Sequence, residues 1–134
     1  VDTDFFAQKR TRKATFTAFG MTKRAGRSAS NDPGVTAIVQ SAAEATCFVA
    51  KAWDYQVELA LGSTTDEHLE GITDTVRTAA AAGNEVLVDL EHFFDGYKAN
   101  RDYALACVTA ALAAGARWVV LCDTNGGTMP AEVR

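Results

Sequence analysis

Residues that mark several large protein classes are scarce in this sequence. It contains two prolines, two histidines and three cysteines in 134 residues, and no apolar run nears the roughly 18 residues of a membrane-spanning helix. The three cysteines (Cys47, Cys107 and Cys122) lack metal-knuckle spacing, so we expect reduced thiols in a cytoplasmic protein rather than disulfides or zinc. Basic residues are fewer than acidic ones, 13 against 17, and the resulting net charge of −4 disfavours nucleic acid and anionic membranes as partners.

Short apolar segments, by contrast, recur at intervals of roughly 35 residues, about the length of a βαβ unit. Each is apolar on both faces, which is typical of parallel strands that are covered on both sides. A composition of 48% apolar and 22% charged residues agrees with about one globular domain. The segments expected to form strands are residues 14–19, 47–53, 86–90 and 118–122.

The segments between these strands show helical periodicity, with apolar residues every three or four positions and thus one face to lay on a sheet. Asp32, Thr64 and Asn100 are suited to cap helix starts, and Gly83 and Gly115 to end helices. We also expect a short helix at residues 4–9 and a last one that begins near residue 130.

The predicted order is a strand followed by a helix, repeated along one partial domain of residues 1–134. It fits half of a closed (β/α)8 TIM barrel, and it also fits an open, doubly wound parallel sheet. No Gly-x-Gly-x-x-Gly follows the first strand, which disfavours the dinucleotide-binding version, so we predict the half-barrel. The chain begins Val-Asp-Thr-Asp without an initiator methionine, and we expect an internal segment of a longer protein.

Polar side chains collect just after the predicted strands, at the end where parallel α/β proteins place their active sites. Asp89 and Glu91 are two apart on one strand and therefore share a face. If that face is the barrel interior, two carboxylates lie in its mouth and can orient a substrate or move a proton. We predict such a role for Glu91, whereas Asp89 either joins it or points outward to a helix N-terminus.

The segment after the fourth strand, Asp123-Thr124-Asn125-Gly126-Gly127, is rich in turn-forming residues. Two interpretations are open for it. The segment is either a turn and nothing more, or it aims the Thr124 hydroxyl at a substrate carboxylate with a supporting hydrogen bond from Asp123.

Other ionisable residues near the strand ends have simpler interpretations. Lys23, Arg24 and Arg27 form a basic loop that is either solvated or grips a phosphate or carboxylate group. We expect His68 at the surface of a helix's first turn, and His92 in a packing or capping role.

Four segments resemble the citramalate-synthase branch of the isopropylmalate and homocitrate synthase family, and together they run along nearly the whole chain. The run Glu-His-Phe-Phe-Asp-Gly-Tyr-Lys is specific to that branch, and Asp-Thr-Asn-Gly-Gly-Thr is close to a motif shared more widely. The segments are residues 17–26, 50–55, 91–100 and 121–130.

The resemblance implies a (β/α)8 barrel and a Claisen-type condensation. Acetyl-CoA loses a methyl proton, and the enolate attacks the ketone of a 2-oxo acid, pyruvate for citramalate synthase, held on a divalent metal. Matched by motif, Glu91 corresponds to a glutamate of the oxo-acid pocket and Thr124 to the threonine that binds its carboxylate. Asp89 falls at a pocket-lining position. A homodimer in branched-chain amino-acid biosynthesis is implied, with isopropylmalate synthase as the alternative.

The family's metal-binding motifs are missing from this sequence. Neither Asp-Thr-Thr-Leu-Arg-Asp-Gly nor His-x-His occurs in it, so we expect the chain to carry strands three to six and no metal ligands. With two bare sheet edges, such a piece should be unstable or self-associating and inactive alone. A half-barrel module that works by self-association, without catalysis, is the alternative from another class.

Overall fold

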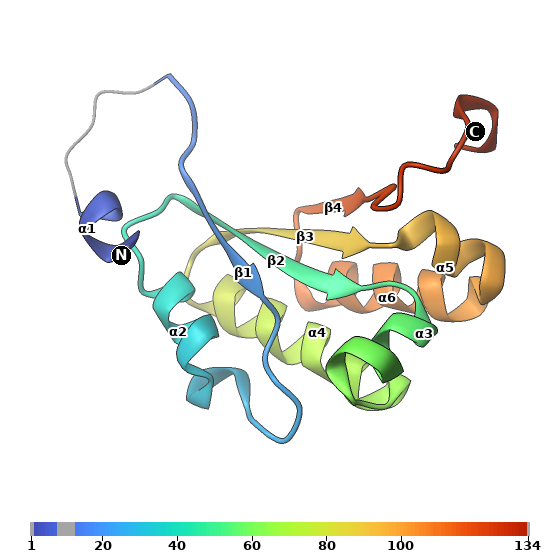
Figure 1. The fold of residues 1–134 in the computed structure, drawn as a ribbon. Helices are drawn as coiled ribbons and strands as arrows, with labels where there is room; N and C mark the ends of the chain where they lie inside the picture. The colour runs from blue at the N-terminus through green and yellow to red at the C-terminus, as the bar shows by residue number, and fades with distance from the viewer. Residues whose placement is uncertain (1, 8–12, 134) are drawn as a thin grey trace.

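Four parallel strands form a single sheet in the order β1-β2-β3-β4 in the computed structural model, which describes residues 2–7 and 13–133 (Figure 1). Each predicted strand is present, with ends shifted by up to three residues. The strands are β1 Thr17–Met21, β2 Ala45–Lys51, β3 Glu85–Glu91 and β4 Trp118–Leu121.

Helices separate the strands, as the periodicity predicts. The helix expected at residues 4–9 begins earlier and ends at Phe6, and residues 8–12 lie outside the described part. The one expected near residue 130 is a single 3-10 turn. The helical elements are α1 Asp2–Phe6, η1 Ala29–Asn31, α2 Pro33–Val39, α3 Asp54–Gln56, the π-helix η2 Val57–Leu61, α4 Thr65–Ala81, α5 Phe93–Ala99, α6 Arg101–Ala114 and η3 Pro130–Glu132.

The capping residues explain where the longer helices start and stop. Asp32 accepts hydrogen bonds from the amides of Gly34 and Val35 at the start of α2. Thr64 and Asn100 cap α4 and α6 in the same way. Gly83 and Gly115 follow the two long helices with φ of 88° and 111°, a left-handed conformation that suits glycine.

Helices α2, α4 and α6 all lie on one face of the sheet (Figure 1). A doubly wound sheet would carry helices on both faces and would change strand order at a switch point. Sequential strand order with helices on one side is instead the arrangement of a (β/α)8 barrel, so the chain is part of such a barrel. Among the described residues, no helix is both long and apolar enough to cross a membrane.

The two faces of the sheet differ in burial. Val86, Val88 and Leu90 of β3 are fully buried against the helices. On the other face, which we call the open face, Phe19 and Val120 of the outer strands are 64% and 41% exposed. The sequence predicts cover on both faces, but this part of a barrel covers only one, because the open face corresponds to the barrel interior.

Candidate functional site

The residue pairing across the sheet places Asp89 and Glu91 on the open face. Strand β3 alternates buried and half-buried residues, and its buried members face the helices, so the half-buried Asp89 and Glu91 face the barrel interior. Asp89 pairs in register with Val49 and Val120. Asp89 therefore does not point to a helix N-terminus, the outward orientation that the sequence leaves open.

Asp89 lies beside a buried thiol. Burial raises the pKa of the Cys47 thiol to about 12, and the charge of the Asp89 carboxylate adds to that rise. Cys47 is thus protonated at neutral pH and, at 7% exposure, acts as a small buried residue.

Glu91, at the carboxyl end of β3, forms an ion pair with Lys51. The two residues are register partners at the ends of β2 and β3, and their side chains are only 30% and 16% exposed. Sequence reasoning did not single out Lys51, although a lysine within an apolar strand is an available signal.

Thr124 lies next to the residue that follows Glu91. Its hydroxyl oxygen accepts a hydrogen bond of 2.8 Å from the backbone amide of His92. His92 has a φ of 57°, which turns the chain sharply after β3 at the N-cap position of α5. Its side chain makes no capping hydrogen bond, and its ring lies 6.1 Å from the Trp53 ring, so of the two expected roles the structure favours packing. The structure therefore brings the loops of β3 and β4 together at Thr124 and His92.

Asp123 holds the turn that carries Thr124. Its carboxylate accepts hydrogen bonds from the Thr128 amide at 3.0 Å and from the Thr128 hydroxyl at 2.9 Å. These bonds, the amide first, lower the pKa of the Asp123 carboxyl. Asp123 therefore has the turn-forming role that the first interpretation gives it. Thr124 belongs to the same turn, but its hydroxyl group contacts the end of β3.

The Glu-His-Phe-Phe-Asp-Gly-Tyr-Lys run has a packing reason for its glycine. A Cβ atom on Gly96 would lie 2.1 Å from the backbone oxygen of Ala52, so only glycine lets α5 approach the loop after β2. Asn100, which caps α6, also donates to the Asp54 carboxylate over 2.6 Å. These contacts join the second and third βα loops into one rim.

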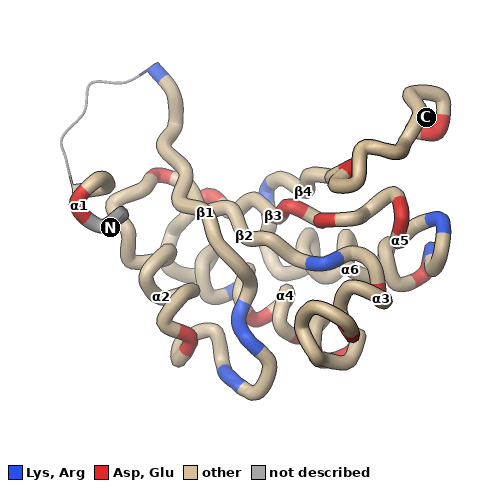
Figure 2. The backbone as a smooth tube through the Cα atoms, viewed as in Figure 1, with Lys and Arg blue, Asp and Glu red and all other residues tan. Residues whose placement is uncertain are grey.

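The basic loop after β1 is held by its backbone. The amides of Lys23, Arg24 and Gly26 donate to side-chain oxygens of Thr75, Asp32 and Glu67. Figure 2 shows these basic residues in the loop after β1, away from the acidic residues of β3. Strand β2 lies between β1, which this loop follows, and β3, which carries Asp89 and Glu91.

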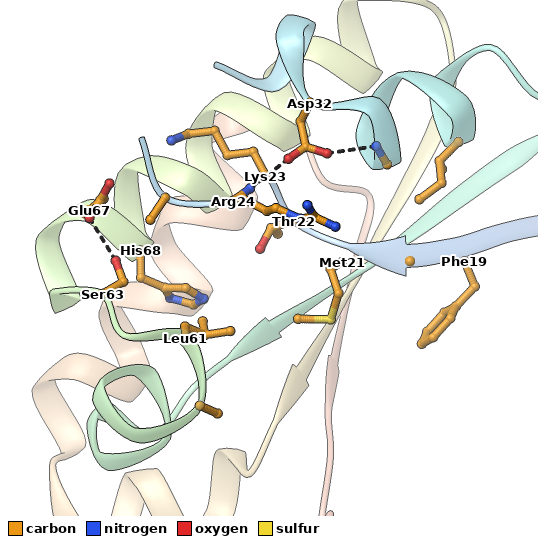
Figure 3. A pocket seen from close by; sticks show the side chains of 15 residues that line it. Phe19, Met21, Thr22, Lys23, Arg24, Asp32, Leu61, Ser63, Glu67 and His68 are labelled. Carbon is orange, nitrogen blue, oxygen red and sulfur yellow. Dashed lines mark hydrogen bonds between the residues drawn. The ribbon is translucent and has the colours of Figure 1, made fainter. Parts of the chain in front are cut away.

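A cavity of about 710 Å³ opens beside the carboxyl end of β1 (Figure 3). The loop after β1, the π-helix η2 and the first turn of α4 form its walls, and Met21, Leu61 and His68 line it. None of the predicted site residues (Asp89, Glu91, Asp123 and Thr124) lines it. The cavity therefore does not contain the predicted site residues, although Phe19 of the open face is among the residues that line it.

His68 is not at the surface, contrary to expectation. It is 6% exposed, and its ring lies between the Lys51 backbone and the Tyr103 hydroxyl. The expectation was wrong because the charged residues of the first turn of α4 flank a position that faces the sheet. Burial, assisted by the charge of Lys51, lowers the pKa of His68 to about 4.

The described residues contain no group of three or more His, Cys, Asp or Glu side chains that could hold a metal ion. A divalent metal of the family type therefore does not fit the side chains that these residues bring together.

The sequential parallel strands with helices on one face define part of a (β/α)8 barrel. The sequence is similar to that of proteins named (R)-citramalate synthase. It is 50% identical to the one from Streptomyces coelicolor over 137 residues, 99% of this chain. It is 46% identical to that of Aquifex aeolicus over 91% of the chain, and 44% identical to that of Geobacter sulfurreducens over 90%.

These relatives confirm the resemblance drawn from the motifs. The chain spans about a quarter of the length of the curated relatives it matches, between 23% and 26%. No family model matches the chain.

Proposed function

We propose that this chain is the central part, strands three to six, of the catalytic barrel of a citramalate-synthase-type acyltransferase, and that it forms the pocket for the 2-oxo acid. The observation that carries the proposal is an identity of 40–50% with five proteins named (R)-citramalate synthase, over 90–99% of the chain. The placement of Glu91 on the open face and of Thr124 beside the following residue supports it.

The proposed reaction joins acetyl-CoA to pyruvate. Acetyl-CoA gives up a methyl proton, the resulting carbon forms a bond to the ketone carbon of pyruvate, and the ketone oxygen becomes a hydroxyl group. Water then cleaves the thioester and releases CoA, which leaves citramalate. Glu91 is the catalytic carboxylate of this chain, because a carboxylate at the barrel mouth can accept and return a proton.

Thr124 is the proposed ligand of the pyruvate carboxylate. Its oxygen already accepts the His92 amide, and no acceptor for its proton lies among the described residues, so the proton is available for donation. Asp89 lines the pocket below Glu91, and Asp123 fixes the turn that presents Thr124. A metal ion that binds the ketone would need ligands other than the side chains described here. The proposed roles of this chain are therefore those of Glu91, Asp89, Asp123 and Thr124 alone.

A segment exchange tests the proposal. The homologous quarter of the Streptomyces coelicolor enzyme is replaced by this chain, and citramalate formation is measured from pyruvate and acetyl-CoA. We expect activity, with kcat/KM for pyruvate at least about tenfold above that for 3-methyl-2-oxobutanoate, because a tight methyl pocket rejects added methyl groups. A folded exchange protein that forms no citramalate contradicts the proposal, and a preference for the larger acid favours isopropylmalate synthase.

We also propose that the 134-residue chain is inactive by itself and that the complete enzyme is a homodimer. Inactivity is expected because the open face of this chain exposes apolar residues that further barrel strands would cover, and because the described residues supply no metal-binding cluster. Citramalate formed by the isolated chain would overturn the first proposal, and a monomer of the exchange protein in sedimentation would overturn the second.

A further inference from the structure

The ion pair between Lys51 and Glu91 lies on one face of the sheet, whereas the side chains that bind the Lys51 backbone come from the other face. Both side chains lie on the open face, at the ends of two neighbouring strands that pair in register. The backbone of Lys51, however, is bound by three buried side chains from the helices of the opposite face: His68, Tyr103 and, through a weaker thiol contact of 3.8 Å to the carbonyl, Cys107. The cation next to the proposed catalytic carboxylate thus depends on groups beneath the sheet.

Strand β1 ends too early to pair with the last residue of β2. The last bond between the two strands runs from the Thr22 amide to the Val49 oxygen, at 3.2 Å. Lys51 follows Val49 by two residues, so its N–H and C=O groups point to the same side of β2 as those of Val49. At this level β1 has already ended and offers them no partner. His68 and Tyr103 take the place of a longer β1 strand.

These two side chains close a ring of hydrogen bonds. The Lys51 amide donates to Nε2 of His68 over 3.4 Å, so the proton of the neutral ring lies on Nδ1. Nδ1 lies 2.9 Å from the Tyr103 hydroxyl oxygen and donates to it. The Tyr103 hydroxyl in turn donates to the Lys51 carbonyl over 3.2 Å, and each donor has one acceptor.

Burial makes this ring rigid. His68 and Tyr103 are each 6% exposed, and a polar network in such a place must be fully satisfied to be stable. The low pKa of His68 agrees with a neutral ring. The Lys51 side chain is the part of this arrangement that reaches the open face, and its ammonium group ends at Glu91.

We propose that Lys51 is a positioning residue for Glu91: the His68–Tyr103 ring fixes the Lys51 backbone, and the Lys51 ammonium group fixes the orientation of the Glu91 carboxylate. The inference rests on the proposed catalytic function of Glu91. An ammonium held between strand ends leaves the carboxylate fewer rotamers, and a proton-transfer group gains rate when it is held in one geometry.

The first test compares Lys51→Met and Lys51→Arg in the exchange protein with the Streptomyces coelicolor relative. Lys51→Met is expected to lower kcat by about 10- to 100-fold, the effect of one lost charged hydrogen bond, with both KM values nearly unchanged. Lys51→Arg keeps the charge and is expected to recover most of kcat. The matched control is Arg117→Met, which removes the cation of an exposed ion pair with Glu85 at the opposite end of the strands.

The outcomes separate this inference from the proposed function. If Glu91→Gln abolishes activity while Lys51→Met retains full kcat, the inference fails and the proposed function stands. A rise in KM for pyruvate at unchanged kcat also overturns it, because Lys51 would then bind the substrate directly. An exchange protein that is folded but inactive contradicts both the proposed function and this inference. If the first exchange protein does not fold, the Aquifex aeolicus relative serves as the second host.

A double-mutant cycle tests the ring. Tyr103→Phe removes only the hydroxyl group and is expected to lower kcat when Lys51 is present but to have little further effect on the Lys51→Met protein. A purely structural Tyr103 would cause the same loss in both backgrounds. Equal losses would therefore overturn the role of the ring. Circular dichroism of each variant at the assay temperature confirms that the compared proteins are folded.

Discussion

The hydroxyl oxygen of Thr124 accepts a 2.8 Å hydrogen bond from the backbone amide of His92, the residue directly after Glu91. This bond ties the loop after β4 to the end of β3. Among the described residues, His92 is the one non-glycine residue with a positive φ, so the chain accepts an uncommon conformation at this point. The proposed carboxylate ligand and the proposed catalytic residue are therefore positioned by one turn.

Thr124 gives a direct prediction about pyruvate. In the exchange protein, Thr124→Val removes both the acceptor for His92 and the donor to the substrate, and KM for pyruvate is expected to rise by about tenfold or more. Thr124→Ser keeps the hydroxyl group and is expected to stay within about threefold of the original value. Steady-state kinetics with pyruvate as the varied substrate checks this; equal effects of the two substitutions would rule out the hydroxyl as the ligand.

Gly96 gives a prediction about stability. Gly96→Ala places a methyl group against the Ala52 carbonyl oxygen and should lower stability by about 1–3 kcal/mol, as overpacking does. Gly71→Ala in α4 is the matched control, because its Cβ would meet the nearest atom, Lys23 Cγ, at an ordinary 3.7 Å. That control should be neutral or more stable by up to about 1 kcal/mol through helix propensity. The unfolding midpoint of the Gly96→Ala exchange protein should fall, and that of the Gly71→Ala protein should stay the same or rise; a fall of the same size in both would contradict the prediction.

His68 predicts how stability depends on pH. Its pKa falls from 6.5 to about 4 on folding. Between these two pH values the His68 ring is protonated in the unfolded chain and neutral in the folded chain. The stability contributed by neutral His68 is thus complete above pH 6.5 and is lost as the pH falls toward 4, by roughly 3 kcal/mol.

Chemical unfolding of the exchange protein at several pH values between 7 and 4 measures this loss. The His68→Gln variant cannot titrate in this range and should show a flatter profile. Parallel profiles of the two proteins would show that His68 is not the group responsible.

The open face predicts self-association of the isolated 134-residue chain. Phe19 and Val120 are exposed there together with Trp118, which is 53% exposed, and apolar surface of this kind drives association. Sedimentation velocity should detect dimers or larger species, and the double substitution Phe19→Ser with Val120→Ser should reduce them. A discrete folded dimer would favour the self-associating half-barrel module, and a stable monomer would contradict the prediction.

The strands and helices were predictable because each depends on local signals. Runs of apolar residues gave four strands, and Asp32 and Asn100 marked helix starts that the structure confirms. The direction of the strands then placed Glu91 and Thr124 at the same end, which depends only on parallel topology.

The missed features depend on contacts between residues far apart in the chain. His68 was expected at the surface, yet its partners Lys51 and Tyr103 are 17 and 35 residues away. The Lys51–Glu91 pair likewise requires the register of β2 against β3, which composition does not give. The exposed open face was not predicted because strands that are apolar on both sides do not reveal how much of their cover lies outside the chain.

The most direct test of the central claim is the rate of citramalate formation by the exchange protein with and without the substitution Glu91→Gln. Glu70→Gln is the control, since Glu70 is exposed on α4 and takes no part in the site. The account predicts that Glu91→Gln lowers kcat by at least about 100-fold, as the loss of a proton-transfer group does, while Glu70→Gln leaves the rate unchanged. A Glu91→Gln protein that forms citramalate as fast as the unsubstituted one would contradict it.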